Sequence, residues 1–322
     1  MDEFRSKLLT WYDAHARDLP WRQDRHPYRI WISEIMLQQT RVAAVIAHYR
    51  EFLRRFPTVQ RLAAAREATV LAIWSGLGYY RRARMLHEAA RVMVRQLRGE
   101  FPQSAAQWRE LPGIGRYTAA AIASIAFREP VAVVDGNVER VLQRIANKSM
   151  AGAEVWQTAE DFLDRARPGD FNQALMELGA TVCTPRNPMC LTCPVMSLCA
   201  TRGELPRQQG PVRQNKREIH YALNHCDEKV LLVQRRRDAK LMADMWELPE
   251  IRRPNSHAKP ALTVRHSITV TDYVVRIWRQ PAPEQNSGKW VATSRLPDIA
   301  LTGLTRKILR KTGLLAMDAN GR

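Results

Sequence analysis

The sequence lacks any hydrophobic run long enough to cross a membrane, and its first residues are too polar for a secretory signal peptide. We therefore expect a cytoplasmic protein in a reducing environment, where structural disulfides are rare. Acidic residues are also scarce: 32 Asp and Glu stand against 50 Lys and Arg, which gives a net charge of +18. This excess predicts a polyanionic partner. The basic residues are spread over helical segments, which favours a broad phosphate-facing surface over a basic tail.

Lysine and cysteine are both infrequent. Only Lys7 and Lys148 precede residue 200, and four of the five cysteines lie between residues 183 and 199 with the spacing C-x6-C-x2-C-x5-C. In a reducing compartment, four thiols this close predict a metal or cluster site. Structural zinc sites more often use two C-x2-C pairs, and only one is present, so an iron–sulfur cluster is favoured over zinc. The predicted ligands are Cys183, Cys190, Cys193 and Cys199. The fifth thiol, Cys226, is expected to be a buried small hydrophobe.

Hydrophobic periodicity divides the chain into parts of different character. From about residue 28 to 180, apolar residues recur at the i, i+3, i+4 spacing of helices. After residue 218, short stretches rich in β-branched and aromatic residues indicate strands. We therefore predict a multi-domain α + α/β protein, with an all-α domain at residues 1–200, a polar linker at 201–218 and a small α/β domain at 219–322.

Two local motifs inside the helical part indicate chemistry. The segment "LPGIGRYTAAAIASIAF" places Gly113 and Gly115 in a turn that opens a helix. Glycines permit a tight turn, and free amides at a helix start attract phosphate, although a plain helix–helix turn is the alternative. Further along, "VAVVDGNVERVL" delivers Asp135 to a turn just before another helix. An acid at that position can cap the helix, so Asp135 alone does not establish a site.

The hairpin, Asp135 and the four cysteines, in this order, resemble the helix-hairpin-helix DNA glycosylase superfamily. The cysteine spacing resembles the [4Fe-4S] loop of its endonuclease III and MutY branches, and "PYRIWISEIMLQQTRV" closely resembles the adenine DNA glycosylase (MutY) family. The resemblance covers nearly the whole chain and is strongest over residues 20–40, 111–140 and 171–199. It implies a base excision repair enzyme with a [4Fe-4S] cofactor that acts on double-stranded DNA containing adenine opposite 8-oxoguanine or guanine.

The resemblance implies a catalytic set built on two carboxyl groups. Glu34, beside apolar residues, would protonate the departing adenine, because a carboxylic acid in an apolar pocket has a raised pKa. Asp135 would stabilise the positive charge that develops on the sugar, as in glycoside hydrolysis. Asn137 and Tyr117 would orient Asp135 and the sugar. Bifunctional relatives carry a nucleophilic lysine where this chain has Tyr117, so lyase activity is expected to be absent or weak.

The resemblance also implies contacts with a flipped-out base and the duplex. Gln39 and Tyr79, with Leu77 nearby, are expected to insert around the opposite base, while Gly113 and Gly115 hold the DNA backbone. Core packing is the alternative for Tyr79 and for its neighbour Tyr80. The predicted adenine pocket is lined by Arg17, Trp21, Arg22 and Glu177.

The last third of the chain resembles the degenerate Nudix-like domain of MutY proteins. A Nudix box is absent, so pyrophosphate hydrolysis is not expected. In the family this domain detects 8-oxoguanine with a loop that has a Phe-Ser-His core. One alignment places that core on Ile268-Thr269-Val270, where Thr269 keeps a hydroxyl but Val270 cannot replace an imidazole. A shifted alignment uses His266 and Ser267, and the choice stays open.

These observations together predict a monofunctional adenine DNA glycosylase that is a monomer, is associated with the bacterial nucleoid and has no membrane partner. One alternative is another glycosylase of the superfamily, acting on thymine in G mismatches or on oxidised pyrimidines; Glu34 and the second domain count against it. A non-catalytic iron–sulfur DNA-binding protein is the other alternative, and the pair of Glu34 and Asp135 counts against that.

Overall fold

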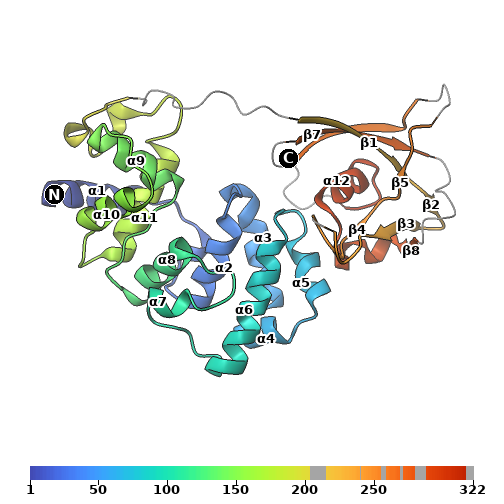
Figure 1. Cartoon of the computed structure of the whole chain (residues 1–322), viewed down its shortest axis with the longest axis horizontal. Helices are drawn as coiled ribbons and strands as arrows, with labels where there is room; N and C mark the ends of the chain where they lie inside the picture. The colour runs from blue at the N-terminus through green and yellow to red at the C-terminus, as the bar shows by residue number, and fades with distance from the viewer. Residues whose placement is uncertain (204–214, 240, 255–258, 269–270, 280–287, 317–322) are drawn as a thin grey trace. The chain divides into compact units, whose positions relative to one another are not determined.

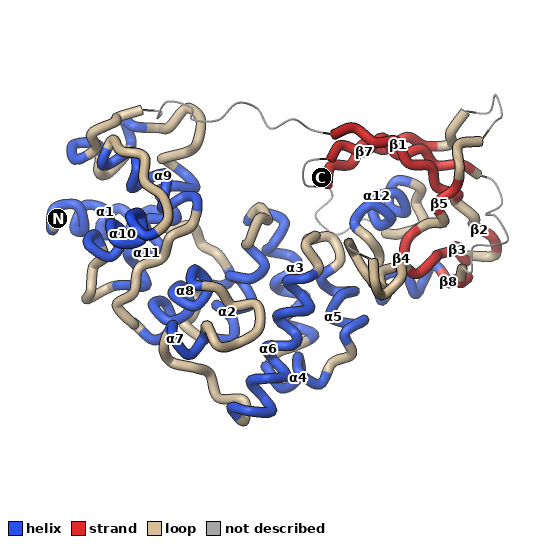
Figure 2. The backbone as a smooth tube through the Cα atoms, in the orientation of Figure 1, coloured by secondary structure: helices blue, strands red, loops and turns tan. Residues whose placement is uncertain are grey.

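The structure is a computed structural model that describes residues 1–203, 215–239, 241–254, 259–268, 271–279 and 288–316. Its contacts divide the chain into two compact units (Figure 1). The helical unit comprises Met1–Ala64 and Met85–Gln208, and the C-terminal unit comprises Ala65–Arg84 and Gln209–Arg322. The predicted class, a helical part followed by a sheet-containing part, is confirmed at this level (Figure 2). Most of the predicted linker lies outside the described residues.

The helical unit is built from short helices with local sequence signals at their starts. Pro27 and Pro168 occupy the first turns of their helices, where a missing amide costs nothing. Ser104 and Gln107 form a reciprocal capping box, and Asp135 caps the helix that follows it. The helices are α1 (Asp2–His15), α2 (Pro27–Leu37), α3 (Val42–Arg55), α4 (Val59–Ala64), α6 (Arg81–Leu97, which begins in the C-terminal unit), α7 (Ala105–Trp108), α8 (Arg116–Phe127), α9 (Gly136–Ala146), α10 (Ala153–Phe162) and α11 (Pro168–Thr181), with 3-10 turns η1 (Pro20–Arg22), η2 (Cys190–Thr192) and η3 (Met196–Leu198).

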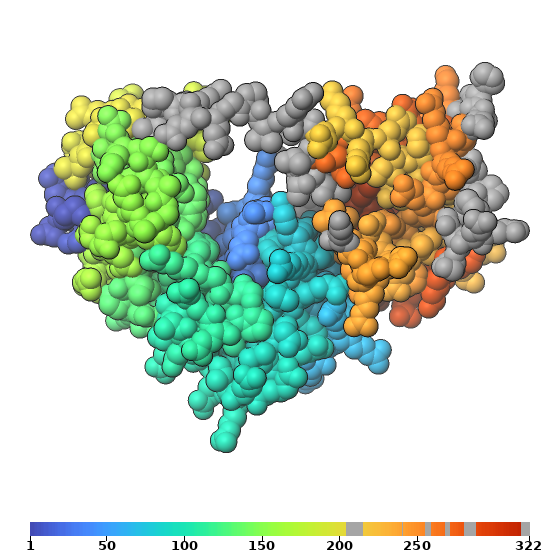
Figure 3. Space-filling view, in the orientation of Figure 1, coloured from blue at the N-terminus to red at the C-terminus, as the bar shows by residue number. Residues whose placement is uncertain are grey.

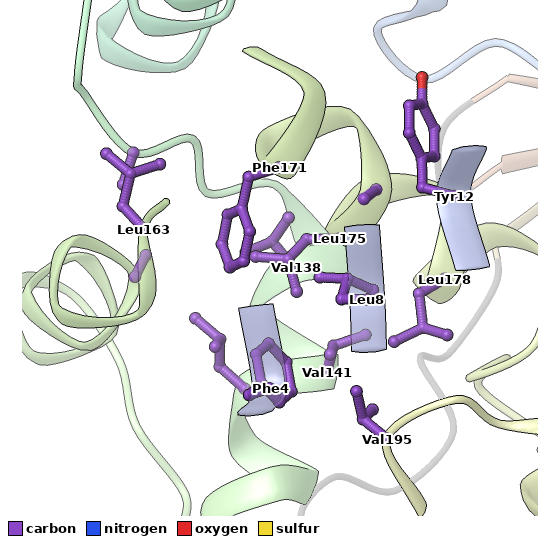
Figure 4. Packing of buried hydrophobic residues seen from close by; sticks show 14 of the residues in the cluster. Phe4, Leu8, Tyr12, Val138, Val141, Leu163, Phe171, Leu175, Leu178 and Val195 are labelled. Carbon is purple, nitrogen blue, oxygen red and sulfur yellow. The ribbon is translucent and has the colours of Figure 1, made fainter. Parts of the chain in front are cut away.

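One apolar core holds together the helices around Asp135 and the segment that carries the cysteines. Leu8 of α1, Val138 of α9 and Leu175 of α11 are buried against one another (Figure 4). Val195, from the cysteine segment, is buried in the same cluster. Figure 3 shows this segment (yellow) beside α1 (dark blue), where Lys7 donates a hydrogen bond of 2.9 Å to Ser197. The start of α9 and the cysteine segment therefore pack into the same hydrophobic core.

The C-terminal unit contains two small sheets and a covering helix. In the first sheet the strand order is β5-β1-β7-β6, with β1 parallel to β7 and the other pairs antiparallel. In the second, β3 lies between its antiparallel neighbours β2, β4 and β8. The elements are α5 (Glu67–Trp74), β1 (Asn215–Ala222), β2 (His225–Cys226), β3 (Lys229–Gln234), β4 (Trp246–Glu247), β5 (Glu250–Ile251), β6 (Leu262–Ile268), β7 (Thr271–Trp278), β8 (Lys289–Ala292), η4 (Thr293–Asp298) and α12 (Gly303–Lys311).

Residues 65–84 are grouped with the C-terminal unit although the sequence places them within the helical part. The Ser75 hydroxyl donates a hydrogen bond of 2.6 Å to the Leu301 carbonyl, and Arg84 donates one of 2.7 Å to the Ala243 carbonyl. Cys226 lies exposed on β2, so the expectation that it is a buried hydrophobe is wrong. Among the described residues, no helix has the length and apolar character needed to cross a membrane.

Candidate active site

The helical unit contains a cavity of about 830 Å³ bordered by residues of α2, α8, α9 and α11. It gathers most of the predicted site residues from distant parts of the sequence. The cavity is lined by Arg17, Trp21, Arg22, Glu34, Gln39, Gly115, Tyr117, Asp135, Asn137 and Glu177. Gly113 is not among the lining residues, and Leu77, Tyr79, His266 and Ser267 belong to the C-terminal unit. Thr269 and Val270 lie outside the described residues.

Glu34 is a buried acid on α2, with 6% of its surface exposed. Neighbouring side chains on this helix, among them Ile32, Ile35 and Met36, are buried and apolar. The hydroxyl of Tyr117 on α8 donates a hydrogen bond of 2.7 Å to Glu34 Oε2. Burial raises the Glu34 pKa from 4.5 to about 7; the nearby Asp135 charge acts in the same direction, while the Tyr117 hydrogen bond and Arg22 oppose it. The carboxyl can therefore hold a proton near neutral pH.

Asp135 is the N-cap of α9, and both oxygens of its carboxylate accept hydrogen bonds from residues in the first turn of this helix. Its Oδ1 accepts hydrogen bonds from the amides of Asn137 (2.9 Å) and Val138 (2.8 Å). Its Oδ2 accepts one of 2.9 Å from the Asn137 side chain. Arg140 in turn donates to Asn137 Oδ1 at 2.9 Å and to the Cys183 carbonyl at 2.9 Å. Asp135 thus both caps α9 and lines the cavity.

Glu177 forms a buried ionic group at another part of the cavity wall. Arg17 donates to Glu177 Oε2 at 2.9 Å, and Arg22 donates to the same oxygen at 2.8 Å. Burial alone would raise the Glu177 pKa, but the hydrogen bonds from both arginines outweigh it and the pKa is lowered. Trp21 lies in the same wall and packs edge-on against Tyr49. This wall combines charged groups with an aromatic ring, which suits recognition of a flat polar ligand.

Several lining residues were not predicted from the sequence. Met176 places its sulfur 3.5 Å from the Tyr117 hydroxyl, and Gln38 donates a hydrogen bond of 3.1 Å to Thr118. Gln173 and Ala180 join Met176 and Glu177 on the same face of α11. Gln173 lies four residues before Glu177 and Ala180 three residues after it. Residues with this spacing share one face of a helix, so the sequence could have predicted both as lining residues.

The two hairpin glycines have different environments. Gly113 has a φ of 75°, and a Cβ there would lie 2.4 Å from Met85 Cβ. Gly115 has an ordinary φ of −88°, and within the described structure a Cβ built on it would have no atom within 4 Å apart from those of its own chain neighbours. It precedes α8 without a side-chain cap, so the first amides of this helix are available to a ligand. Gly113 is therefore needed for the conformation of the turn, whereas Gly115 leaves room for a ligand to approach the backbone closely.

The proposed insertion residues share an uncommon backbone conformation, each within its own unit. Gln39 has a φ of 54° and Tyr79 one of 47°, in the left-handed region that non-glycine residues seldom adopt. Tyr79 is 49% exposed, whereas Leu77 and Tyr80 are each 6% exposed. Core packing, the alternative considered for both tyrosines, therefore describes Tyr80 and not Tyr79.

The four clustered cysteines are all free and half-buried. Burial raises the pKa of the Cys193 thiol to about 11, and the charges of Cys183, Cys199 and Cys190 act in the same direction. Arg144 approaches the Cys183 sulfur at 3.2 Å. Across the described residues, however, no three His, Cys, Asp or Glu side chains are grouped as ligands of a metal ion. Two observations support a shared ligand set, namely the closeness of the four cysteines in the sequence and the electrostatic influence of three of the thiols on Cys193. The arrangement of the described side chains does not form a metal-ion site.

The two described candidates for lesion recognition lie on β6. His266 is half-buried and pairs across the sheet with Tyr273. Burial lowers the His266 pKa, and the positive charge of Lys307 contributes. Ser267 is exposed and its hydroxyl bonds to Asp272.

Comparison with known proteins agrees with this geometry. A model of the HhH-GPD superfamily of base excision DNA repair proteins matches residues 32–163. The adenine DNA glycosylase of Homo sapiens is 50% identical over 221 residues, which cover 64% of this chain and 40% of the human protein. The chain thus spans about two fifths of the length of that relative.

Solved structures show the same fold. A thermostable thymine-DNA glycosylase superposes with a TM-score of 0.58 at 32% identity, covering 62% of this chain and 95% of that one. A trapped endonuclease III–DNA covalent intermediate superposes with a TM-score of 0.55 at 23% identity, covering 62% and 96%, and supports the fold alone.

The helical unit brings a hairpin glycine turn, a buried acid and a helix-capping aspartate to one cavity, and residues 32–163 of this unit and its neighbouring segment match the HhH-GPD superfamily of base excision DNA repair proteins. Curated relatives that match this chain, from Homo sapiens, Mus musculus and Buchnera aphidicola, are adenine DNA glycosylases.

Proposed function

We propose that the protein is a monofunctional DNA glycosylase that hydrolytically removes adenine mispaired with 8-oxoguanine or guanine. The observation that carries the proposal is the buried Glu34 carboxyl, with a pKa of about 7, in the same cavity as Asp135. Two carboxyl groups whose environments differ in this way are suited to separate acid and stabilising roles.

The chemistry follows from the protonation of the leaving group. Protonated Glu34 donates its proton to a ring nitrogen of the flipped-out adenine, so the C–N bond breaks with its electron pair leaving on the base. Asp135, held by the amides of Asn137 and Val138, stabilises the positive charge that forms on the sugar. Water then adds to the sugar carbon and gives up a proton to a carboxylate. Tyr117 keeps the Glu34 carboxyl in place during the transfer.

The cavity composition supports hydrolysis without strand cleavage. Its described lining includes Arg17, Arg22, Arg41 and Arg116 but no lysine. A Schiff-base lyase needs an amine nucleophile, and a guanidinium does not serve because it stays protonated. The protein should therefore leave an abasic site intact.

Double-stranded DNA is the partner that the charge and the cavity favour. The net charge of +18 supplies phosphate attraction, and the free amides after Gly115 offer a backbone contact. Exposed Tyr79 is suited to insertion near the opposite base, together with Gln39. The buried side chain of Leu77 is suited to support of that loop.

The test is single-turnover adenine release with Glu34→Gln, measured on duplexes with A opposite 8-oxoguanine, A opposite guanine and T opposite guanine. The expected loss is about 10²- to 10⁴-fold, with DNA affinity retained. Glu100→Gln, an exposed residue with the same charge change, is the matched control. Strand breaks should form only after alkali. Release of thymine and not adenine would favour the thymine glycosylase alternative, and indifference to Glu34→Gln would favour a non-catalytic DNA-binding protein.

The proposal includes a [4Fe-4S] cluster on Cys183, Cys190, Cys193 and Cys199. Four free, half-buried thiols that influence one another electrostatically are a suitable donor set. When bound, the cluster would act structurally, by shaping the basic segment 183–199 against DNA. Iron and acid-labile sulfide in equal amounts, lost together on Cys193→Ala, are the expected analytical result. Zinc alone would contradict the cluster and leave a metal role for the same thiols.

We further propose that the C-terminal unit is a Nudix-like domain that recognises 8-oxoguanine. His266 and Ser267 on β6 present an imidazole and a hydroxyl, the donor types that such recognition needs. Ser267→Ala and His266→Ala should reduce the preference for 8-oxoguanine over guanine opposite adenine while the rate on the guanine duplex is maintained. An unchanged preference would remove both residues from lesion recognition.

A further inference from the structure

The loop that carries Tyr79 is bonded to the last helix of the C-terminal unit. The Ser75 hydroxyl donates to the Leu301 carbonyl at 2.6 Å, and Arg306 Nε on α12 donates to the Ser75 oxygen at 3.0 Å. A serine hydroxyl has one proton and two lone pairs, so Ser75 uses its donor on Leu301 and one acceptor site on Arg306. Ser75 is buried, which places this bonded chain away from competing water.

A second contact holds the other end of the loop. Tyr80 is buried, and its hydroxyl lies 3.4 Å from the same Leu301 carbonyl. Leu77 is also buried. Tyr79 is therefore an exposed aromatic residue between buried neighbours, and its direction is set by contacts of residues 75, 77 and 80.

The loop backbone adopts conformations that need such support. Gly76 and Gly78 have φ values of 113° and 70°, and Tyr79 has one of 47°. The left-handed region is unfavourable for a non-glycine residue, so this conformation persists only where surrounding contacts maintain it. Arg82 supplies part of this support: its guanidinium lies 5.5 Å from the Tyr79 ring centroid and donates to the Leu77 and Gly78 carbonyls.

We propose that Arg306 and Ser75 are positioning residues that orient Tyr79 for insertion into DNA. This inference rests on the proposed insertion role of Tyr79. The reason is preorganisation: a loop already fixed in its DNA-bound conformation loses less conformational entropy on binding than a loop that must be ordered. The C-terminal unit thereby contributes to the insertion step through α12, in addition to any reading of the lesion by its strands.

The test is a double-mutant cycle on affinity for a mismatched duplex relative to a fully paired one, with intact full-length protein. The variants are Arg306→Gln and Tyr79→Ala, alone and combined. A second series uses Ser75→Ala, and Arg306→Lys retains the charge without the Nε donor. Lys311→Gln, exposed on the same helix, is the charge-matched control. The fluorescence of 2-aminopurine beside the opposite base reports insertion directly.

We expect Arg306→Gln, Arg306→Lys and Ser75→Ala each to reduce mismatch preference about fivefold to tenfold and to reduce the insertion signal. In the Tyr79→Ala background the same changes should have less than about a twofold effect, because their route to DNA is gone. Equal losses in both backgrounds, or rescue by Arg306→Lys, would overturn the inference in favour of simple phosphate attraction. If Tyr79→Ala has no effect of its own, the inference also fails. Adenine release by the unmodified protein is measured separately. If the effects in the double-mutant cycle are additive, the positioning role fails while the proposed glycosylase activity can still hold.

Discussion

The Tyr117 hydroxyl donates its hydrogen bond to Glu34 Oε2 at 2.7 Å, and this joins α8 to α2 inside the cavity. The bond favours the ionised carboxylate, while burial favours the protonated acid. Burial is the larger influence, so the Glu34 pKa rises to about 7. The balance between these two effects determines how much of the enzyme carries the acid form near neutral pH.

The first prediction concerns the pH dependence of adenine release. Because the active form carries a protonated Glu34, the rate at subsaturating enzyme should decline above about pH 7, by about tenfold per pH unit well above the pKa. Single-turnover rates from pH 5.5 to 9 on one mismatched duplex provide the measurement. A rate that is flat to pH 9 would show that Glu34 is not the proton donor.

Tyr117→Phe should shift that decline. The Tyr117 hydrogen bond lowers the Glu34 pKa, so its removal raises the pKa and moves the alkaline limb of the profile to higher pH. Tyr28→Phe removes another buried hydroxyl bond, of 2.8 Å to the Phe56 carbonyl, and should leave the limb in place. A shift to lower pH in Tyr117→Phe would contradict the assigned direction.

Glu34→Gln should be more stable than the parent protein in alkaline solution. The folded carboxyl has a higher pKa than in the unfolded chain, so it favours folding below about pH 4.5, and this contribution is lost as the pH rises through about 7. The variant avoids burying the ionised group. At about 1.4 kcal/mol per pKa unit, its advantage at pH 8 should approach about 3 kcal/mol and be much smaller at pH 5. Urea unfolding at both pH values measures the difference.

Asp135→Asn should separate the capping role from the charge. Asparagine caps helices about as well as aspartate, so the free energy of unfolding should change by less than about 1 kcal/mol. Loss of the negative charge should lower adenine release by about 10²- to 10³-fold. Asp164 accepts equivalent bonds from the amides of Ala166 and Arg167, and Asp164→Asn is the control that should retain activity. A fully active Asp135→Asn would confine Asp135 to helix capping.

The two hairpin glycines should respond differently to alanine. Gly113→Ala should destabilise the protein by more than about 1 kcal/mol, because its φ is positive and the new Cβ would meet Met85. Gly115→Ala should change stability by less than about 0.5 kcal/mol and still weaken DNA binding, since the methyl group stands where a phosphate would approach. Denaturant unfolding and DNA titration of both variants test the pair. Unchanged DNA affinity in Gly115→Ala would remove this turn from the interface.

Much of the fold was predictable because its signals are local. The i, i+3, i+4 pattern gave the helices around Glu34, Tyr117 and Asp135, and β-branched stretches gave the later strands. The grouping of residues 65–84 with the C-terminal unit was not predictable in this way. Four of the eight residues of α5, namely Val70, Leu71, Ala72 and Trp74, are buried, and such a segment is apolar over most of its surface. Its pattern therefore does not indicate which partner covers it.

The sequence by itself determined the chemical inventory of this protein: the acid on α2, the tyrosine in place of a lysine, the capping aspartate and the four spaced thiols. Only the tertiary structure decided which of these groups act on one another. Glu34 and Tyr117 are separated by 83 positions in the chain, yet a hydrogen bond joins them. The Glu34 pKa depends on burial by side chains from other helices, which no local pattern contains. The direction of Tyr79 likewise depends on Ser75, Leu301 and Arg306, because long-range packing and not local propensity fixes a strained loop.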